Sequence, residues 1–223
     1  MSILVLDTET TGLSAEEDRV CEIAVVEVDP RQRTMGQFAQ SLVNPGRGIP
    51  HQASAVHHLT DSHVEGAPGL EEVLDRLVPA GVEAYCAHNA QFDRGFLIGL
   101  PDRPWVCTWK CAKAVWSEAP SYSNQVLRYW LKLDVPLLTG RGAYPHSALY
   151  DALTTAQILL KLLEEKSVEE LVEISGRPVL LKKMTFGKHK GTLFSEVPKD
   201  YRAWLRRQPD LDDDLKYTLD YHA

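Results

Sequence analysis

The sequence predicts an α/β domain with a mixed five-stranded sheet flanked by helices, followed by a small C-terminal α+β module. Three predicted strands, residues 3–8, 20–28 and 37–43, come first and have no helical segment between them. This order is typical of an antiparallel meander. The later strands alternate with helices, which favours parallel pairing. The two patterns together predict a mixed sheet.

The elements after the third strand are assigned from apolar spacing and turn residues. A polar turn at His88 and Asn89 separates a short strand from a helix. The helix after Pro145 keeps apolar side chains at a helical period from Leu149 to Leu163. The elements expected in this part are a short helix within 50–66, helices at 70–78, 90–99, 108–116, 123–132 and 147–164, and strands at 82–87 and 105–107.

Three segments follow one another along the chain: a main domain at 1–166, a connector helix at 167–178 and a module at 179–223. Ser167 and Glu170 form a capping-box pattern that starts the connector, and Gly176 to Pro178 end it. In the module we expect a hairpin at 180–197, then two short helices with the apolar stripes Tyr201, Trp204, Leu205 and Leu215, Tyr217, Leu219. A module of this size has a marginal core, so it should pack against the main domain or another chain.

The composition is that of an ordinary globular chain. It has 223 residues, 44% of them hydrophobic, and no apolar run approaches the roughly 18 residues that a transmembrane helix needs. No basic leader or long apolar segment precedes Asp7, so we expect a cytoplasmic protein that does not bind membranes. The four cysteines are expected to be buried reduced thiols, because no second Cys/His pair at zinc-finger spacing follows Cys107 and Cys111.

The net charge of −7 is unevenly distributed. Residues 1–176 carry 14 Lys and Arg against 24 Asp and Glu, residues 177–207 carry nine against two, and the tail from 208 carries one against five. A basic segment beside an acidic domain suits contact with a phosphate backbone, although a solvated basic face without a partner fits the charge equally well. We expect residues 177–207 to supply affinity for a polyanion.

Two acids end the first strand. Asp7 and Glu9 follow the apolar run 3–6, and on a strand the i, i+2 spacing places both side chains on one face. Buried acids so close together need cations to offset their repulsion and desolvation. Asp-x-Glu by itself would also fit a strand that runs into an acidic loop. The later motifs favour a metal site.

Asp93, His146 and Asp151 complete the candidate site. Asp93 and Asp151 fall in the first turn of expected helices, where an acid can also simply complement the helix dipole. On one continuous helix His146 and Asp151 would lie roughly 140° apart. Pro145 breaks that continuity, so His146 is expected in the preceding loop, within reach of a metal held by Asp151. An imidazole with a pKa near 6.5 suits a general base for water.

With these five residues the chain resembles the DEDD superfamily of 3′–5′ exonucleases, in the subgroup whose fifth residue is His (DEDDh). The matching motifs are Asp7-x-Glu9, Asn89-x-x-x-Asp93 and His146-x4-Asp151, in this order, within residues 1–166. The resemblance implies a ribonuclease-H-like fold. It also implies that Asp7, Glu9, Asp93 and Asp151 hold two Mg²⁺ or Mn²⁺ ions, that His146 is the general base, and that nucleoside 5′-monophosphates are released.

Several residues near the motifs are expected to bind substrate. Thr10, Thr11, Gly12 and Leu13 follow the acids directly and are expected to line the pocket of the terminal nucleotide, with Leu13 stacked on a base. His58, Asn89 and Phe92 are further candidates, although Phe92 fits a place in the core equally well. The expected partner is nucleic acid, namely DNA 3′ ends in single-stranded or duplex form, with DNA repair as the setting. Two alternatives stay open, an exoribonuclease that trims RNA 3′ ends and a nucleic-acid-binding module without activity.

Overall fold

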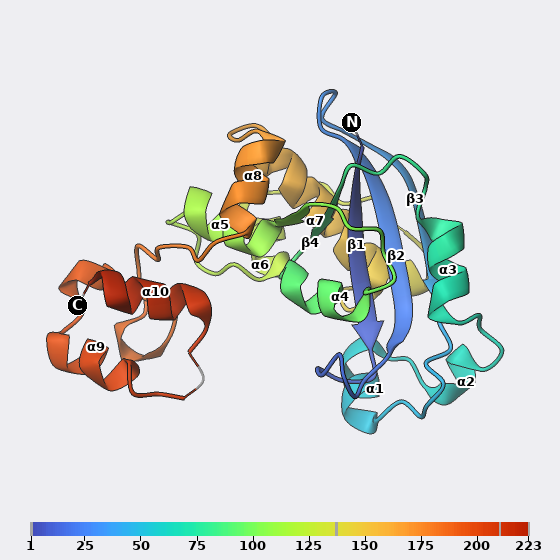
Figure 1. Ribbon diagram of the computed structural model, residues 1–223, viewed down its shortest axis with the longest axis horizontal. Coiled ribbons are helices and arrows are strands. Elements are labelled where there is room, and N and C mark those ends of the chain that lie inside the picture. The colour runs from blue at the N-terminus through green and yellow to red at the C-terminus, as the bar shows by residue number, and fades with distance from the viewer. Residues whose placement is uncertain (1, 137, 210, 223) are drawn as a thin grey trace.

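The main domain is organised around one mixed sheet (Figure 1). The structure, a computed structural model, describes residues 2–136, 138–209 and 211–222. Its strands are β1 (Ile3–Thr10), β2 (Val20–Asp29), β3 (Thr34–Leu42), β4 (Ala84–Ala87) and β5 (Trp105–Cys107), in the spatial order β3-β2-β1-β4-β5. The β1–β2 and β2–β3 pairs are antiparallel, and the β1–β4 and β4–β5 pairs are parallel. The predicted mixed five-stranded sheet is confirmed.

The helices agree with the predicted order, but their ends differ by a few residues. The expected helix at 90–99 ends at Phe96, and the stretch 50–66 contains two short helices instead of one. The helices are α1 (His51–His57), α2 (Asp61–Val64), α3 (Leu70–Leu77), α4 (Ala90–Phe96), α5 (Thr108–Val115), α6 (Asn124–Trp130), α7 (Ala148–Leu162), α8 (Val168–Ser175), α9 (Lys199–Leu205) and α10 (Asp213–Tyr221), with 3₁₀ turns at Gly140–Ala143, Gly187–His189 and Phe194–Glu196.

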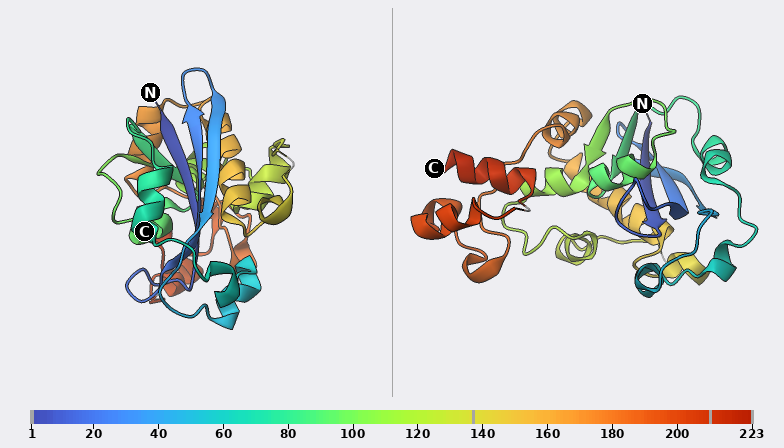
Figure 2. Two further views of the ribbon diagram at one scale, coloured as in Figure 1. Left: turned by 90° about the vertical axis from the view of Figure 1, so that its right-hand side faces the viewer. Right: turned by 60° about the horizontal axis from the view of Figure 1, so that its bottom comes forward.

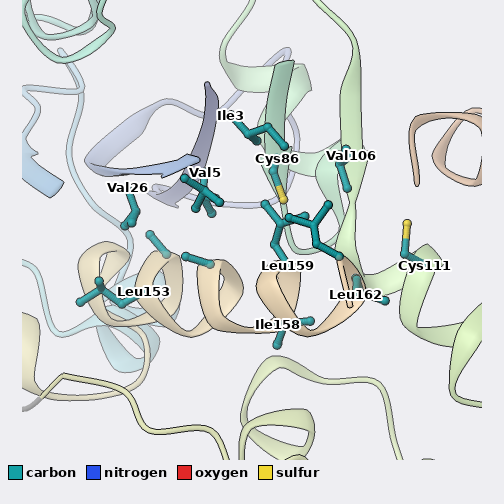
Figure 3. Packing of buried hydrophobic residues seen from close by; sticks show 14 of the residues in the cluster. Ile3, Val5, Val26, Cys86, Val106, Cys111, Leu153, Ile158, Leu159 and Leu162 are labelled. Atoms are coloured by element: carbon teal, nitrogen blue, oxygen red, sulfur yellow. The ribbon is translucent and has the colours of Figure 1, made fainter. Parts of the chain in front are cut away.

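Alternate residues of β1 enter two separate cores. Leu4 and Leu6 pack in the core that includes residues of α3 and α4. Ile3 and Val5 pack in the core that includes α7, where Figure 3 shows them above Leu159 and its neighbours. Because side chains alternate along a strand, Asp7 and Glu9 continue the Ile3–Val5 face. The sheet therefore presents both acids on the side that α7 covers.

The C-terminal module has its own small core, and the predicted hairpin is present there in a short, irregular form. Lys183 and Leu193 form an isolated antiparallel bridge, and the 3₁₀ turn Gly187–His189 lies between them. Gly187 and Gly191 have positive φ angles of 68° and 84°, which interrupt the extended backbone that a ladder needs. The core residues are Leu181, Met184, Phe194, Val197, Leu205, Leu215 and Leu219.

A buried ion pair joins the module to the main domain. Lys113 on α5 binds Asp214 on α10, and both side chains are almost fully buried. Asp214 also accepts a hydrogen bond from the Val179 backbone at 2.8 Å. Breaking a buried pair of this kind by removing one partner typically costs about 3–5 kcal/mol. The module lies beside α5, at the end of the molecule opposite β3 (Figures 1 and 2).

The remaining expectations concern thiols and membranes. All four cysteines are free and buried, as predicted. No helix in the described part of the chain has both the length and the apolar character that crossing a membrane requires.

Candidate active site

Three of the predicted acids meet at the end of β1. Asp7 and Glu9 come from β1, and Asp151 comes from the first turn of α7. One carboxylate oxygen of each lies within 4.8 Å of the other two. α7 packs across the Ile3–Val5 face of the sheet, so its first turn is carried to the strand end where the acids lie. Motifs separated by more than 140 residues thus form one site.

Burial and mutual repulsion make these carboxyl groups hard to ionise. Burial raises the pKa of Asp7 well above its usual range, and the nearby Asp151 and Asp93 raise it further. Burial and then the charge of Asp151 raise the pKa of Glu9 to about 8. Burial also raises the pKa of Asp151, although the His146 backbone N–H lowers it in part. The site therefore favours binding of a positively charged group such as a metal cation.

Asp93 approaches the site from the other face of the sheet. Its Oδ1 accepts hydrogen bonds from the Thr8 backbone N–H at 3.1 Å and from the Thr8 hydroxyl at 2.8 Å. Burial raises its pKa to about 7, whereas the bonds from Thr8 lower it. Asp93 is thus fixed beside the cluster of three but does not belong to it, an arrangement that suits support of a second ion.

His146 lies in the loop before α7, as Pro145 predicted. It is exposed, and its φ of 63° is in the left-handed region, which is uncommon for a residue with a side chain. This conformation directs its backbone N–H to Oδ2 of Asp151 at 2.9 Å. Oδ1 of the same carboxylate accepts a hydrogen bond from Gln125 at 3.0 Å. The backbone of the His146 loop therefore forms a hydrogen bond with Asp151, one of the three acids of the candidate metal site.

Glu22 is a residue that the motifs did not reveal. It lies opposite Glu9 in the β1–β2 pairing, and its side chain is 1% exposed. Arg141 binds both of its oxygens, with a 2.9 Å contact to Oε2, and the Ala148 backbone N–H donates to Oε2 at 3.0 Å. Residues 141 and 148 flank His146, so Glu22 holds both ends of its loop. An acid inside the apolar run 20–26 was the available signal.

The predicted substrate residues divide into two groups. Thr10, Thr11, Gly12, Leu13 and Phe92 line a pocket of about 320 Å³ beside Glu9. Leu13 is 87% exposed at its edge, a position suited to contact with a base. The pocket is at the small end of the range for ligand sites, about 300–1,000 Å³, which suits one terminal nucleotide.

The structure places His58 and Asn89 outside this pocket. Each has a positive φ and stands at a helix terminus, His58 at the end of α1 and Asn89 before α4. His57 lines the pocket instead. Burial lowers the pKa of His57, and its Nδ1 accepts a hydrogen bond from the Leu59 backbone. His57 is thus an uncharged residue in the wall of the pocket.

The donor set fits hard divalent cations. Carboxylate oxygens are the ligands that Mg²⁺ and Mn²⁺ prefer, whereas sites for softer metals use Cys or His. In the described part of the chain, these three half-buried acids are the one group of at least three such side chains close enough to share an ion. Arg141 lowers the pKa of Glu9 but already binds Glu22, so the cluster itself holds excess negative charge.

Comparison with known proteins agrees with this geometry. Residues 4–159 match the family model described as Exonuclease. Exodeoxyribonuclease 10 of Escherichia coli (strain K12) is 34% identical over 227 residues, covering 98% of this chain and 97% of the relative. A DNA polymerase III subunit epsilon-like protein of Rhodobacter capsulatus is 36% identical over 73% of this chain and 24% of its own.

Solved structures agree as well. Exonuclease X in complex with 5′ overhanging duplex DNA has a TM-score of 0.68 and 35% identity, covering 78% of this chain and 99% of that one. The nuclease domain of 3′hExo, a DEDDh family member bound to rAMP, has a TM-score of 0.58 at 16% identity over 74% of this chain and 92% of that one, and supports the fold alone. The chain belongs to the exonuclease family.

Proposed function

We propose that this protein is a metal-dependent 3′–5′ exodeoxyribonuclease that releases nucleoside 5′-monophosphates from DNA 3′ ends. The observation that carries the proposal is the meeting of Asp7, Glu9 and Asp151 within 4.8 Å beside the His146 loop. The likeness to exodeoxyribonuclease 10 along nearly the whole chain supports DNA over RNA as the substrate.

Each acid has a role that follows from its position. Asp7, Glu9 and Asp151 would hold one Mg²⁺ or Mn²⁺ ion, and Asp93, fixed by Thr8, would support a second. When bound, the ions act as Lewis acids at the scissile phosphate and offset the charge that develops there. The 3′-terminal nucleotide occupies the pocket beside Glu9, with Leu13 against its base.

The test follows strands labelled at either end. Single-stranded DNA, duplex DNA and RNA of one sequence are incubated with the enzyme and Mg²⁺, and the products are resolved by length. A label at the 3′ end should be released at once as a mononucleotide. A strand labelled at its 5′ end should become shorter one nucleotide at a time. Release from the 5′ end would contradict the polarity. Faster release from RNA than from either DNA would contradict the proposed substrate.

His146→Ala should reduce kcat by roughly 10²–10⁴-fold, because a positioned general base usually contributes that much. Since the proposed role of the imidazole is to take a proton from water, metal binding should change little. The measurements are single-turnover release rates and a calorimetric Mg²⁺ titration of the same preparations. His51→Ala, an exposed histidine at the start of α1, is the matched control. A His146→Ala protein that no longer binds metal would identify His146 as a ligand.

Glu22→Gln should lower kcat by roughly 10- to 100-fold and leave KM for DNA nearly unchanged, because a small misplacement of a reacting group has an effect of that order. Glu22 is a positioning residue that acts through the His146 loop. In a His146→Ala background, Glu22→Gln should therefore reduce the rate little further. Equal fold-losses in both backgrounds would contradict that role. Glu27→Gln, on the same strand, is the control.

A further inference from the structure

The basic segment predicted from the sequence exposes most of its cations on the surface of the module. Of its nine Lys and Arg residues, six are exposed and form no ion pair with another described residue. The other three are engaged, since Arg177 pairs with Glu173, Arg206 lies near Asp220, and Arg202 donates to the His222 carbonyl. The six exposed cations are Lys182, Lys183, Lys188, Lys190, Lys199 and Arg207.

Two aromatic rings form a platform within this surface. The Tyr201 and Trp204 rings of α9 lie 5.3 Å apart with an interplanar angle of 31°, and Trp204 is 45% exposed. Lys188 Nζ lies 4.9 Å from the centre of the Tyr201 ring. A Cβ at Gly187 would come within 2.9 Å of the Tyr201 hydroxyl, so the loop that carries Lys188 packs directly on the platform. One cation, Lys188, thus borders the half-buried Tyr201 ring, which lies next to the exposed Trp204 ring.

The same loop borders a groove between the module and the main domain. A groove of about 320 Å³ lies between residues 117–123 of the main domain and the module, and Lys183 and Lys190 line its module side. Glu118 and Asp212 also line it, but Asp212 caps α10 through the Leu215 backbone N–H. The loop 117–123 leads directly into α6, where Gln125 binds Asp151. At about 3.8 Å per residue, residue 123 lies within roughly 8 Å of Gln125 along the backbone.

We propose that the platform and the groove bind a single-stranded segment of the DNA substrate, with bases stacked on Trp204 and phosphates at Lys188 and Lys190. This inference rests on the proposed function. Exposed rings beside cations are the means by which proteins bind single strands, because every base has a face for stacking and every nucleotide a phosphate. The catalytic domain is net acidic, so a polyanion gains affinity from contacts outside it.

The test measures binding separately from cleavage. Full-length protein in EDTA is titrated against a fluorescent oligothymidylate of about 30 nucleotides, and anisotropy is recorded between about 50 and 200 mM NaCl. Lys188→Ala with Lys190→Ala should lower the slope of log K against log salt by about 1.4, or about 0.7 for each lost phosphate contact. Trp204→Ala should weaken binding about 5- to 150-fold, the equivalent of ~1–3 kcal/mol for a stacked base, and leave the slope unchanged.

Matched controls separate this surface from general effects. Lys161→Ala with Lys166→Ala removes the same charge from the α7–α8 junction of the main domain, and Phe38→Ala removes an aromatic of equal exposure, 45%, from the edge strand β3. Both should bind as the wild type does. Platform variants that bind like the wild type, or controls that lose as much affinity, would overturn the inference. An equal effect of Trp204→Ala on circular duplex DNA would also overturn it, since base pairs inside a duplex have no free face to stack on the ring.

Different results would contradict the proposed function and the proposed binding of single-stranded DNA by the module. A wild type that releases no nucleotide from any DNA fails the proposed function, whereas the anisotropy titration needs no hydrolysis. Thermal unfolding of each variant shows whether its fold is intact. A fully active wild type with an unchanged salt slope in the double lysine variant would contradict the inference alone.

Discussion

Removal of divalent cations with EDTA should abolish nucleotide release, and Mg²⁺ or Mn²⁺ should restore it. The reason lies in the cluster of Asp7, Glu9 and Asp151, in which one carboxylate oxygen of each half-buried residue lies within 4.8 Å of the other two. Without cations, these acids repel one another and also repel the phosphate that must approach them. Release of 3′-terminal label after dialysis against EDTA, followed by titration with each metal, gives the measurement.

The same treatment should change stability in a known direction. An ion that binds only the folded protein stabilises it in proportion to the logarithm of its concentration above Kd. The melting temperature of the wild type should therefore rise with added Mg²⁺. Undiminished nucleotide release in EDTA, together with a melting temperature that Mg²⁺ does not alter, would contradict the assignment of the three acids to a metal site.

The sheet could be predicted from the sequence because its signals are local. Apolar runs mark β1 and β2, and the absence of a helix between the first three strands specifies their antiparallel order. The segment 180–197 was less well predicted, because its alternation of apolar residues suggested a ladder. Positive φ angles at Gly187 and Gly191 and packing of the loop on Tyr201 leave a single bridge there instead. These tertiary contacts have no local signature in the sequence.

The site was predictable where a residue's role depends on its own element. The i, i+2 spacing placed Asp7 and Glu9 on one face, and Pro145 placed His146 in a loop. Glu22 was missed because its partner, Arg141, is 119 positions away. Only the pairing register places Glu22 opposite Glu9. Contacts of this kind depend on how elements pack, which spacing along the chain does not specify.

Asp7→Asn should reduce the rate of nucleotide release by several orders of magnitude while the protein remains folded. Asp7 belongs to the three-carboxylate cluster that would hold a metal ion. The substitution keeps the shape of the side chain and removes one negative charge, so the loss reflects coordination more than packing. Single-turnover release and calorimetric Mg²⁺ titration measure it. Asp75→Asn, an exposed acid on α3, is the matched control.

The metal-free protein provides an independent readout of the same charge. Burial raises the pKa of Asp7 well above its usual range and that of Glu9 to about 8, so the folded state keeps protons that the unfolded chain releases near pH 4. Where the folded state binds more protons, stability falls as pH rises. The melting temperature of the wild type in EDTA should therefore decline between about pH 4 and pH 8, and that of Asp7→Asn should decline less steeply.

Near pH 8 without metal, the Asp7→Asn variant should be more stable than the wild type. With saturating Mg²⁺ the order should reverse, because the wild type binds the ions more tightly. An Asp7→Asn protein that is less stable than the wild type in EDTA at that pH would show that the cluster is not repulsive.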